Sequence, residues 1–371
     1  MRISSSYENS LPPENLENIG TPNYIFPFIE ILSVDIVDTV DMVVGLTMMM
    51  KLKWKDYNIH FENIKTSHGE EKAIQRIPVK DGRKLWLPHK YIVHENAILG
   101  EIKKEKAYIL EVEVTEKAKT MNPEESRETQ IYQGKDSWLI LSQRIKSKYI
   151  CKFSLANFPF DKSSCEFIIT LDMTENNSIR LMDEIDSVVY HGPKILNEFK
   201  IFKLGSNTQI SHKKTSYIFT IFFERLYMQY LLTTFFQSFL LLVLAYLTLL
   251  IDHTDFSNRF MGALTCLLVL VSLLSTISED IPKTAYYKYV DIWFNWFILN
   301  IFTIILLHVL VDYLHKDFHQ VLPINVAEYN HLKTQNMRTK SQYLNTICKL
   351  IIPICNIFFI TIYFYISIYV Y

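Results

Sequence analysis

The stretch Tyr230–Ile251 reads "YLLTTFFQSFLLLVLAYLTLLI" and contains no charged residue in 22 positions. An α-helix needs about 20 apolar residues to cross the hydrocarbon core of a bilayer. Three further uncharged stretches follow, at Phe260–Ile277, Ile292–Val311 and Leu350–Tyr371. The sequence therefore predicts a C-terminal, all-α transmembrane domain of four helices.

The four stretches are grouped three plus one. Short polar links separate the first three, whereas 38 residues separate the third from the fourth. That segment has a small excess of basic residues, which favours the cytoplasmic side. We expect spans 1–3 within residues 226–313, a cytoplasmic linker at 314–346 and the fourth span at 347–371. An even number of spans then places both termini outside the cell.

Residues 1–225 have a different pattern. Stretches such as "IEILSVDIVD" and "YIFTIFFER" alternate with a period of two, and turn signals such as "KDGRK" and "ENNS" separate them. The pattern predicts an extracellular, all-β sandwich at the plasma membrane. Such a domain needs an export signal, yet "MRISSSYENSLPPENLENIG" has no apolar signal core. We expect either an incomplete start or an unusual export route.

Composition argues against several other classes of protein. The 38 basic residues nearly balance the 39 acidic ones, so no bulk charge favours a nucleic-acid partner. The sequence contains no Gly-rich phosphate loop, nucleophile elbow or paired-carboxylate motif, and its 11 histidines lack zinc spacing. We expect no enzyme, no cofactor and no metal site, although a pH-sensitive site at His89 stays open.

Two cysteines bracket the segment "CKFSLANFPFDKSSC". In an extracellular domain Cys151 and Cys165 can pair, and closing so short a loop contributes about 3 kcal/mol. Two unpaired, buried thiols are the alternative. One acceptable N-x-S/T site, at Asn176, is consistent with export. The remaining cysteines fall in or beside apolar stretches, and the simplest interpretation is that they are membrane-core residues: Cys266, Cys348 and Cys355.

Several motifs occur in one order along the chain. They are "WKDYNI", "LWLPHKYIV", the cysteine pair with its "FPFD" tip, "FFERLYMQY" before the first span, and "IPKTAYYKYVDIW" between the second and third spans. Together with the three-plus-one grouping, they resemble the Cys-loop family of pentameric ligand-gated ion channels over nearly the whole chain. The last motif is similar to the linker of the GABA, glycine and glutamate-gated chloride branch.

The resemblance implies a coupling junction between the β domain and the spans. The loop would press its apolar tip on the link between the second and third spans, and an arginine would form a buried ion pair with nearby acids. The implied residues are Phe158, Pro159, Phe160, Asp161, Asp38, Arg225, Pro282 and Lys283. Without the family, the tip reads as an ordinary turn capped by core aromatics, and Arg225 as a snorkelling residue at the membrane edge.

The second span carries polar residues every three or four positions, as expected of a helix with one face toward water. The resemblance makes that face the pore lining and Leu268 a hydrophobic constriction. The alternative is a packing face, since serine and threonine also occur between helices. The implied lining residues are Asn258, Arg259, Met261, Thr265, Leu268, Ser272, Ser275 and Glu279.

The sequence contains indications of cation selectivity and of anion selectivity. Cation-selective relatives carry a glutamate where this chain has Asn258, and anion-selective relatives carry Pro-Ala where it has Ser257-Asn258. Glu279 and Asp280 would place acids at the outer mouth, whereas Arg259 at the inner mouth could attract anions. With the chloride-type linker, the balance favours anions.

The ligand-binding positions depart from the family pattern. Relatives that bind amines surround the cation with aromatic rings. The corresponding positions here are Met49, Tyr91, Asp172 and Lys214, of which Tyr91 alone is aromatic. An aromatic-cage amine site is therefore not expected, and a solvated surface is the alternative for the two charged residues. Gln237 also replaces a proline of the first span.

The sequence as a whole predicts a subunit of a pentameric channel in a lipid bilayer, formed with identical or sibling subunits. A small extracellular ligand would open it, and chloride selectivity is favoured. The alternative is a non-conducting accessory or assembly subunit of a heteromeric receptor. A third interpretation is an adhesion or sensing ectodomain on an unrelated four-span anchor.

Overall fold

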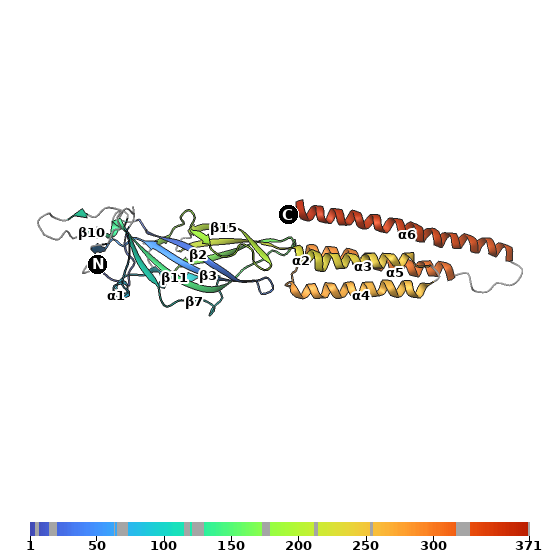
Figure 1. Ribbon diagram of the computed structural model, residues 1–371, viewed down its shortest axis with the longest axis horizontal. Helices are drawn as coiled ribbons and strands as arrows, with labels where there is room; N and C mark the ends of the chain where they lie inside the picture. Colours follow the sequence, from blue (N-terminus) through green and yellow to red (C-terminus); the bar gives the residue numbers. More distant parts are fainter. Residues whose placement is uncertain are drawn as a thin grey trace. The chain divides into compact units, whose positions relative to one another are not determined.

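The computed structural model describes residues 1–3, 7–14, 21–62, 64, 73–114, 119–120, 130–172, 179–210, 214–252, 255–316 and 327–369. The chain forms two compact units (Figure 1). The first, the β unit, consists of Met1–Phe153 and Ser163–Phe223. The second, the helical unit, consists of Ser154–Lys162 and Glu224–Tyr371. The predicted site at Asn176 lies outside the described residues.

The described part of the β unit is built almost entirely from strands, with one short helix, α1 (Val79–Gly82), and 3-10 turns at Pro88–Lys90 and Gly134–Asp136. The strands are β1 (Arg2–Ile3), β2 (Asn23–Asp38), β3 (Val43–Trp54), β4 (Ile59–Glu62), β5 (Ala73–Arg76), β6 (Ile92–His94), β7 (Lys103–Lys104), β8 (Ile109–Val114), β9 (Lys119–Thr120), β10 (Gln130–Gln133), β11 (Ser137–Ile150), β12 (Lys162–Leu171), β13 (Ile179–Leu181), β14 (Val188–Tyr190), β15 (Phe199–Ile210) and β16 (Thr215–Arg225).

Two sheets enclose the core of the β unit. The larger sheet follows the order β13-β2-β3-β11-β8-β5, and the opposing sheet follows β15-β16-β12-β6. Strand β3 pairs antiparallel with β2 on one side and β11 on the other, and its alternate residues Leu46, Met48 and Met50 are fully buried. Tyr149 of β11 packs edge-on against Phe167 of β12, with ring centroids 4.9 Å apart. The period-two pattern therefore did predict the sandwich, and the fold class is confirmed.

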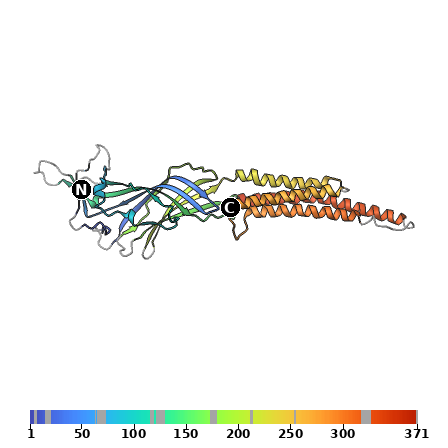
Figure 2. The ribbon, with the colours of Figure 1, turned by 90° about the horizontal axis from the view of Figure 1, so that it is seen from below.

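The described part of the helical unit contains four long helical segments, which can be followed in Figures 1 and 2. The first span starts as α2 (Met228–Tyr230), passes through a π-helical turn at Leu231–Phe235, and continues as α3 (Phe236–Leu247) and a 3-10 turn at Thr248–Leu250. The others are α4 (Phe256–Asp280), α5 (Tyr289–Lys316) and α6 (Ala327–Tyr369). Helix α4 packs against α3 and α5, and α5 packs against α6.

All four segments are long and apolar enough to cross a bilayer, at Met228–Leu250, Phe256–Glu279, Tyr289–Leu314 and Tyr343–Ser367. Helix α6 begins well before its apolar part, so much of the segment expected as a linker is helical. The residues in that part include good helix formers and no proline or glycine, which allows the helix to continue.

Candidate functional site

The loop between the two cysteines joins the two units through the chain. Cys151 and Cys165 form a disulfide with their Cα atoms 5.4 Å apart, which confirms the predicted pairing. Both cysteines belong to the β unit, whereas the loop residues Ser154–Lys162 belong to the helical unit. The loop is thus covalently closed at its base in one unit and packed among residues of the other.

An ion pair lies in the interior beside this loop. Nε of Arg225 donates to Oδ1 of Asp161 at 2.7 Å, and Nη2 donates to Oδ2 at 3.3 Å. Each side chain is 1% exposed. The backbone N–H of Arg225 also donates to the carbonyl of Asp161 at 3.2 Å. Because removing one partner would leave a buried charge, breaking this pair costs about 3–5 kcal/mol.

Aromatic rings surround the ion pair and the tip of the loop. The guanidinium carbon of Arg225 lies 4.9 Å from the centroid of Phe158, and Phe158 packs edge-on against Tyr230 at 4.9 Å. Phe160 contacts Tyr227 at 5.0 Å, and its centroid is 6.4 Å from that of Phe364 near the end of α6. Pro159 is buried and follows a cis peptide bond. The two phenylalanines therefore pack on the first and fourth spans.

The loop backbone reaches the link between α4 and α5. The N–H of Leu155 donates to the hydroxyl of Tyr286 at 3.2 Å, and the N–H of Tyr289 donates to the carbonyl of Ala156 at 2.8 Å. Of the link residues named from the sequence, Pro282 is half-buried and Lys283 is exposed. These hydrogen bonds lie three to seven residues beyond Lys283 and Pro282, at tyrosines of the "AYYKY" segment, and the role of Pro282 and Lys283 stays a prediction.

Asp38, the second acid proposed for the junction, belongs to the β unit. Its Oδ1 accepts hydrogen bonds from the N–H groups of Val40 at 2.9 Å and Asp41 at 3.0 Å. The carboxylate therefore caps the turn that joins β2 to β3. Its role in coupling stays a prediction.

Helix α4 has an exposed polar stripe along its length. Its members recur every three or four positions and are exposed in the chain: Asn258, Met261, Thr265, Leu268, Ser272, Ser275 and Glu279. The opposite face is buried at Ala263, Leu270 and Ile277. Seven of the eight residues predicted to line the pore thus share one free face of the helix.

The hydroxyls of the stripe bond to the helix itself. The Oγ1 of Thr265 donates to the carbonyl of Met261 at 3.0 Å, and the Oγ of Ser272 donates to that of Leu268 at 3.0 Å. A hydroxyl bound in this way still has acceptor capacity toward water or a hydrated ion. Two members of the stripe are large and apolar, Met261 in the first turns and Leu268, 60% exposed, at mid-helix. The arrangement can form a hydrated path with one apolar constriction.

Arg259 does not belong to the exposed stripe, which corrects the sequence assignment. Its side chain is 2% exposed, its Nε donates to the carbonyl of Thr248 at 3.3 Å, and its Nη2 donates to Oδ1 of Asn345 at 3.0 Å. The physical reason is the helical step of about 100° per residue, which turns Arg259 away from Asn258. Arg259 joins the inner ends of the first, second and fourth spans.

Three of the four predicted ligand positions lie together. The N–H of Asp172 donates to the carbonyl of Tyr91 at 2.8 Å, and Nζ of Lys214 is 4.0 Å from Oδ1 of Asp172. The ring of Tyr91 stacks on Trp86 at 5.9 Å. Met49 lies on the other sheet, in β3, and is half-buried. The arrangement offers a cation, an anion and one aromatic ring at a single place.

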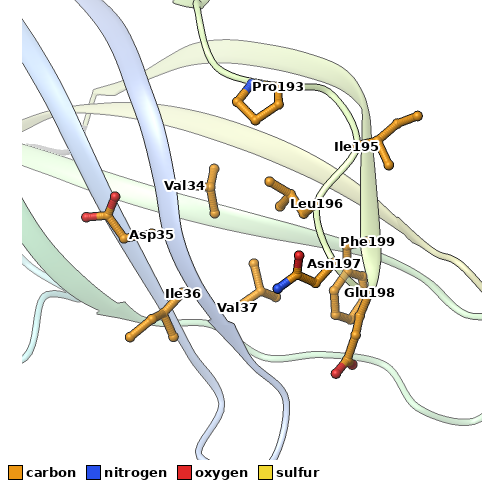
Figure 3. Close-up of a pocket in the computed structure, with 10 residues that line it drawn as sticks. All are labelled: Val34, Asp35, Ile36, Val37, Pro193, Ile195, Leu196, Asn197, Glu198 and Phe199. Atoms are coloured by element: carbon orange, nitrogen blue, oxygen red, sulfur yellow. The ribbon is translucent and has the colours of Figure 1, made fainter.

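A separate cavity of about 410 Å³ lies in the β unit between β2 and the segment before β15 (Figure 3). Asp35 lines it, but its carboxylate is already bound by Ser33, by Thr47 and, at 3.0 Å, by Lys146. Burial raises the pKa of Asp35, and these hydrogen bonds outweigh burial and lower it overall. The acid is therefore engaged within the chain, and the cavity carries no assignment.

His89 is partly buried beside Tyr108. Burial, together with the charges of Lys90 and Lys104, lowers the pKa of His89 to about 4. The imidazole is therefore neutral at neutral pH and gains a proton only in acid. A pH response at this histidine, if present, belongs to that range.

The comparisons with known proteins agree with this geometry. The profile of the family described as neurotransmitter-gated ion-channel ligand binding domain matches residues 1–228. The chain belongs to the neurotransmitter-gated ion-channel family. Its members are channels rather than enzymes, and the predicted Cys-loop resemblance is confirmed. With four spans after a ligand-binding domain, this family member is a multi-pass plasma-membrane protein.

Relatives of this neurotransmitter-gated channel chain include proteins named for GABA and chloride. It is 22% identical to the gamma-aminobutyric acid receptor subunit rho-2 of Homo sapiens over 77% of this chain and 57% of that protein. It is 22% identical to the gamma-aminobutyric acid receptor subunit beta of Lymnaea stagnalis over 79% of this chain and 56% of that protein. It is 24% identical to pH-sensitive chloride channel 2 of Anopheles gambiae over 57% of this chain and 33% of that protein. The chain thus spans little more than half the length of the first two.

The residues at the start of α4 differ from both selectivity signatures considered above. Asn258 is exposed, and its Nδ2 donates to Oδ2 of Asp255 at 2.6 Å. Asp255 is also the residue that caps the start of α4. At the other end Glu279 is exposed. Gln237 in the first span is exposed as well, with no side-chain hydrogen bond to another described residue.

Proposed function

We propose that this chain is a subunit of a pentameric, extracellular ligand-gated channel that conducts anions. The observation that carries the proposal is the exposed stripe of α4, in which Asn258, Thr265, Ser272, Ser275 and Glu279 recur at helical spacing on one face of an otherwise apolar helix. Five such stripes around an axis would form a hydrated path. The names of the relatives and the chloride-type linker favour anions over cations.

Gating would run through the coupling junction. A ligand that binds one state of the β unit more tightly shifts the equilibrium between two states. The loop closed by the disulfide would transmit that shift, because its ion pair with Arg225 ties it to the segment before the first span, and its hydrogen bonds to Tyr286 and Tyr289 tie it to the α4–α5 link and to the start of α5. The gate would be the ring formed by Leu268.

The ligand would carry charges of its own. Asp172 and Lys214 suit the ammonium and the carboxylate of an amino-acid zwitterion, with the ring of Tyr91 beside them. Two relatives are receptors for gamma-aminobutyric acid by name, a molecule of this chemical class. Met49, from the other sheet, would contribute from a neighbouring subunit.

The test is whole-cell current from cells that make the chain with an added export signal and the substitution Leu268→Ser. A polar ring removes the apolar constriction, so we expect a resting leak that reverses at the chloride potential. Ile354→Ser, at an exposed position of α6, is the matched control and should give no leak. A leak that follows the sodium gradient would overturn the anion assignment.

The second candidate is an accessory subunit that does not conduct alone. It is favoured by the ligand positions, where Met49, Asp172 and Lys214 replace the rings typical of the family. If the Leu268→Ser chain reaches the cell surface without leak, and leak appears when a sibling subunit is added, the accessory role replaces the first proposal.

A further inference from the structure

A lysine and two histidines of the β unit form a basic cluster: Lys104, His89 and His94. Lys104 lies in β7, beside β11 of the larger sheet, whereas His94 ends β6, the edge strand of the opposing sheet, and His89 lies in the turn before β6. Nζ of Lys104 donates to the carbonyl of Ile92, between the two histidines, at 3.4 Å. The three side chains therefore meet where the two sheets come together at one edge.

Lys104 acts electrostatically on both imidazoles of the basic cluster. Burial lowers the pKa of His94 to about 4, and the charge of Lys104 adds to the shift. At His89 the same two causes act together with the charge of Lys90. Both rings are therefore neutral at neutral pH, and each lies within reach of one ammonium group.

Each imidazole of the basic cluster has one buried nitrogen without a hydrogen-bond partner in the described part of the chain, Nδ1 of His89 and Nε2 of His94. His94 is 5% exposed, and its Nδ1 lies 2.9 Å from the hydroxyl of Tyr149. Burial raises the pKa of Tyr149, so the hydroxyl keeps its proton and can donate it to Nδ1. In that tautomer Nε2 of His94 is an N–H donor without an acceptor, which is rare for a buried group.

The charge of Lys104 is not balanced by an acid of the chain. Partial burial lowers the pKa of Lys104, and no carboxylate among the described residues opposes that shift or forms a salt bridge with it. The two acids closest in sequence are engaged elsewhere: Glu101 lies 3.6 Å from Lys148, and Glu105 lies 3.9 Å from Arg144. The basic cluster therefore has one net positive charge and donors without acceptors.

These properties are complementary to a small monovalent anion. An ammonium and N–H groups stabilise negative charge, and one such charge neutralises the single charge of Lys104, whereas a dianion would leave an excess in a partly buried place. The ammonium repels a metal cation, and the described residues contain no group of three metal-ligating side chains. A buried water would pair with the free nitrogens but leave the charge of Lys104 unbalanced. Lys104 is exposed, so an ion can enter from solvent.

We propose that the basic cluster binds one monovalent anion of the size of chloride, between the ammonium of Lys104 and the free nitrogens of His94 and His89. The anion joins β7 to the segment that contains Tyr91, one of the residues proposed for ligand binding. Because the cluster belongs to the β unit, this site is different from the exposed stripe of α4.

The test measures whether chloride stabilises the full chain through Lys104. Thermal unfolding of the protein in detergent is followed at constant ionic strength while sodium chloride replaces sodium gluconate. An ion that binds only the folded chain raises the unfolding midpoint, and we expect a rise of roughly 2–4 °C. Neither this measurement nor the next depends on whether the chain conducts current.

Three variants separate binding at the cluster from a general effect of salt. Lys104→Gln removes the ammonium at an exposed position and should abolish the rise, whereas Lys104→Arg keeps the charge and should retain it. Lys103→Gln, the matched control, removes the same charge from the adjacent exposed residue of β7 and should respond like the unchanged chain. An equal rise in Lys104→Gln, or an equal loss in Lys103→Gln, would overturn the proposal.

A bromide derivative locates the ion directly. In crystals of the full chain grown in sodium bromide, we expect an anomalous-scattering peak within hydrogen-bonding distance of Nζ of Lys104 and Nε2 of His94. Density there without an anomalous signal would identify water in place of the anion and would contradict the proposal, as would the absence of any peak.

Discussion

Helices α4 and α6 have nearly the same mean hydropathy, 2.3 and 2.1 over their apolar windows, but the opposite distribution of polar residues. In α4 the interior face carries Ala263, Leu270 and Ile277, and the exposed face carries the hydroxyls of Thr265, Ser272 and Ser275 beside the apolar Met261 and Leu268. In α6 the reverse holds: Asn356 is buried, and the exposed face is apolar at Leu350, Ile351, Ile354, Ile357 and Phe358.

The difference indicates what each exposed face meets. Apolar side chains on α6 suit lipid tails, whereas hydroxyls on α4 suit water. Total hydropathy cannot separate a lipid-facing span from a pore-lining one, because both must insert into the membrane. The angular distribution of the few polar residues does separate them, and it can be tested helix against helix.

The largest difference between α4 and α6 is expected in the accessibility of introduced thiols to an aqueous reagent. In a chain whose free cysteines Cys266, Cys348 and Cys355 are replaced by alanine, Ser272→Cys and Ile354→Cys are treated with a charged, membrane-impermeant thiol reagent. Moving a charge into the bilayer centre costs about 3 kcal/mol, so we expect reaction at residue 272 to be on the order of 100-fold faster. Similar rates at the two positions would contradict a lipid-facing α6 and a water-facing α4.

The buried Asn356 of α6 is expected to stabilise the helical unit, so its replacement should lower stability. Oδ1 of Asn356 accepts from Nε1 of Trp296 at 2.9 Å, and its Nδ2 donates to Oδ1 of Asn300 at 3.2 Å. Asn356→Leu leaves the indole N–H without this acceptor and should cost about 1–3 kcal/mol. Thermal unfolding in detergent measures the effect, with Thr361→Leu as the control that should leave the midpoint unchanged. An unchanged midpoint in Asn356→Leu would show that this network does not hold α6.

The smallest effect is expected for the exposed hydroxyls of α4. The Oγ1 of Thr265 donates to carbonyls of its own helix, and the side chain is exposed. Thr265→Val keeps the shape and should change the free energy of unfolding by less than about 0.5 kcal/mol. A loss of 2 kcal/mol or more in the same unfolding assay would mean that this face packs against protein rather than water.

The sequence predicted much of this from periodicity. Alternation with a period of two defined the sandwich, apolar length defined the spans, and a period of three to four defined the stripe of α4. Arg259 was misplaced because it was assigned by its position along the chain. Because consecutive residues of an α-helix are about 100° apart around the axis, Arg259 and Asn258 cannot lie on the same face.

Other features depend on packing between distant segments. Nothing local to Tyr286 or Tyr289 distinguishes them from the neighbouring Tyr287, which is 78% exposed. Their hydrogen bonds to Leu155 and Ala156 join residues more than 130 positions apart. The choice of partner therefore follows from the folded helical unit and not from the motif.

The division of the cysteine-bounded loop between the two units has a consequence for protein engineering. The chain passes between the units at residues 153/154, 162/163 and 223/224. A secreted β domain ended at Phe223 would carry Phe158 and Phe160 away from Tyr230 and Tyr227, and would keep Asp161 without its arginine. Such a fragment would expose an apolar patch at the loop, and an exposed apolar patch favours aggregation. A soluble version of this ectodomain should therefore be made with a redesigned polar loop in place of the native tip.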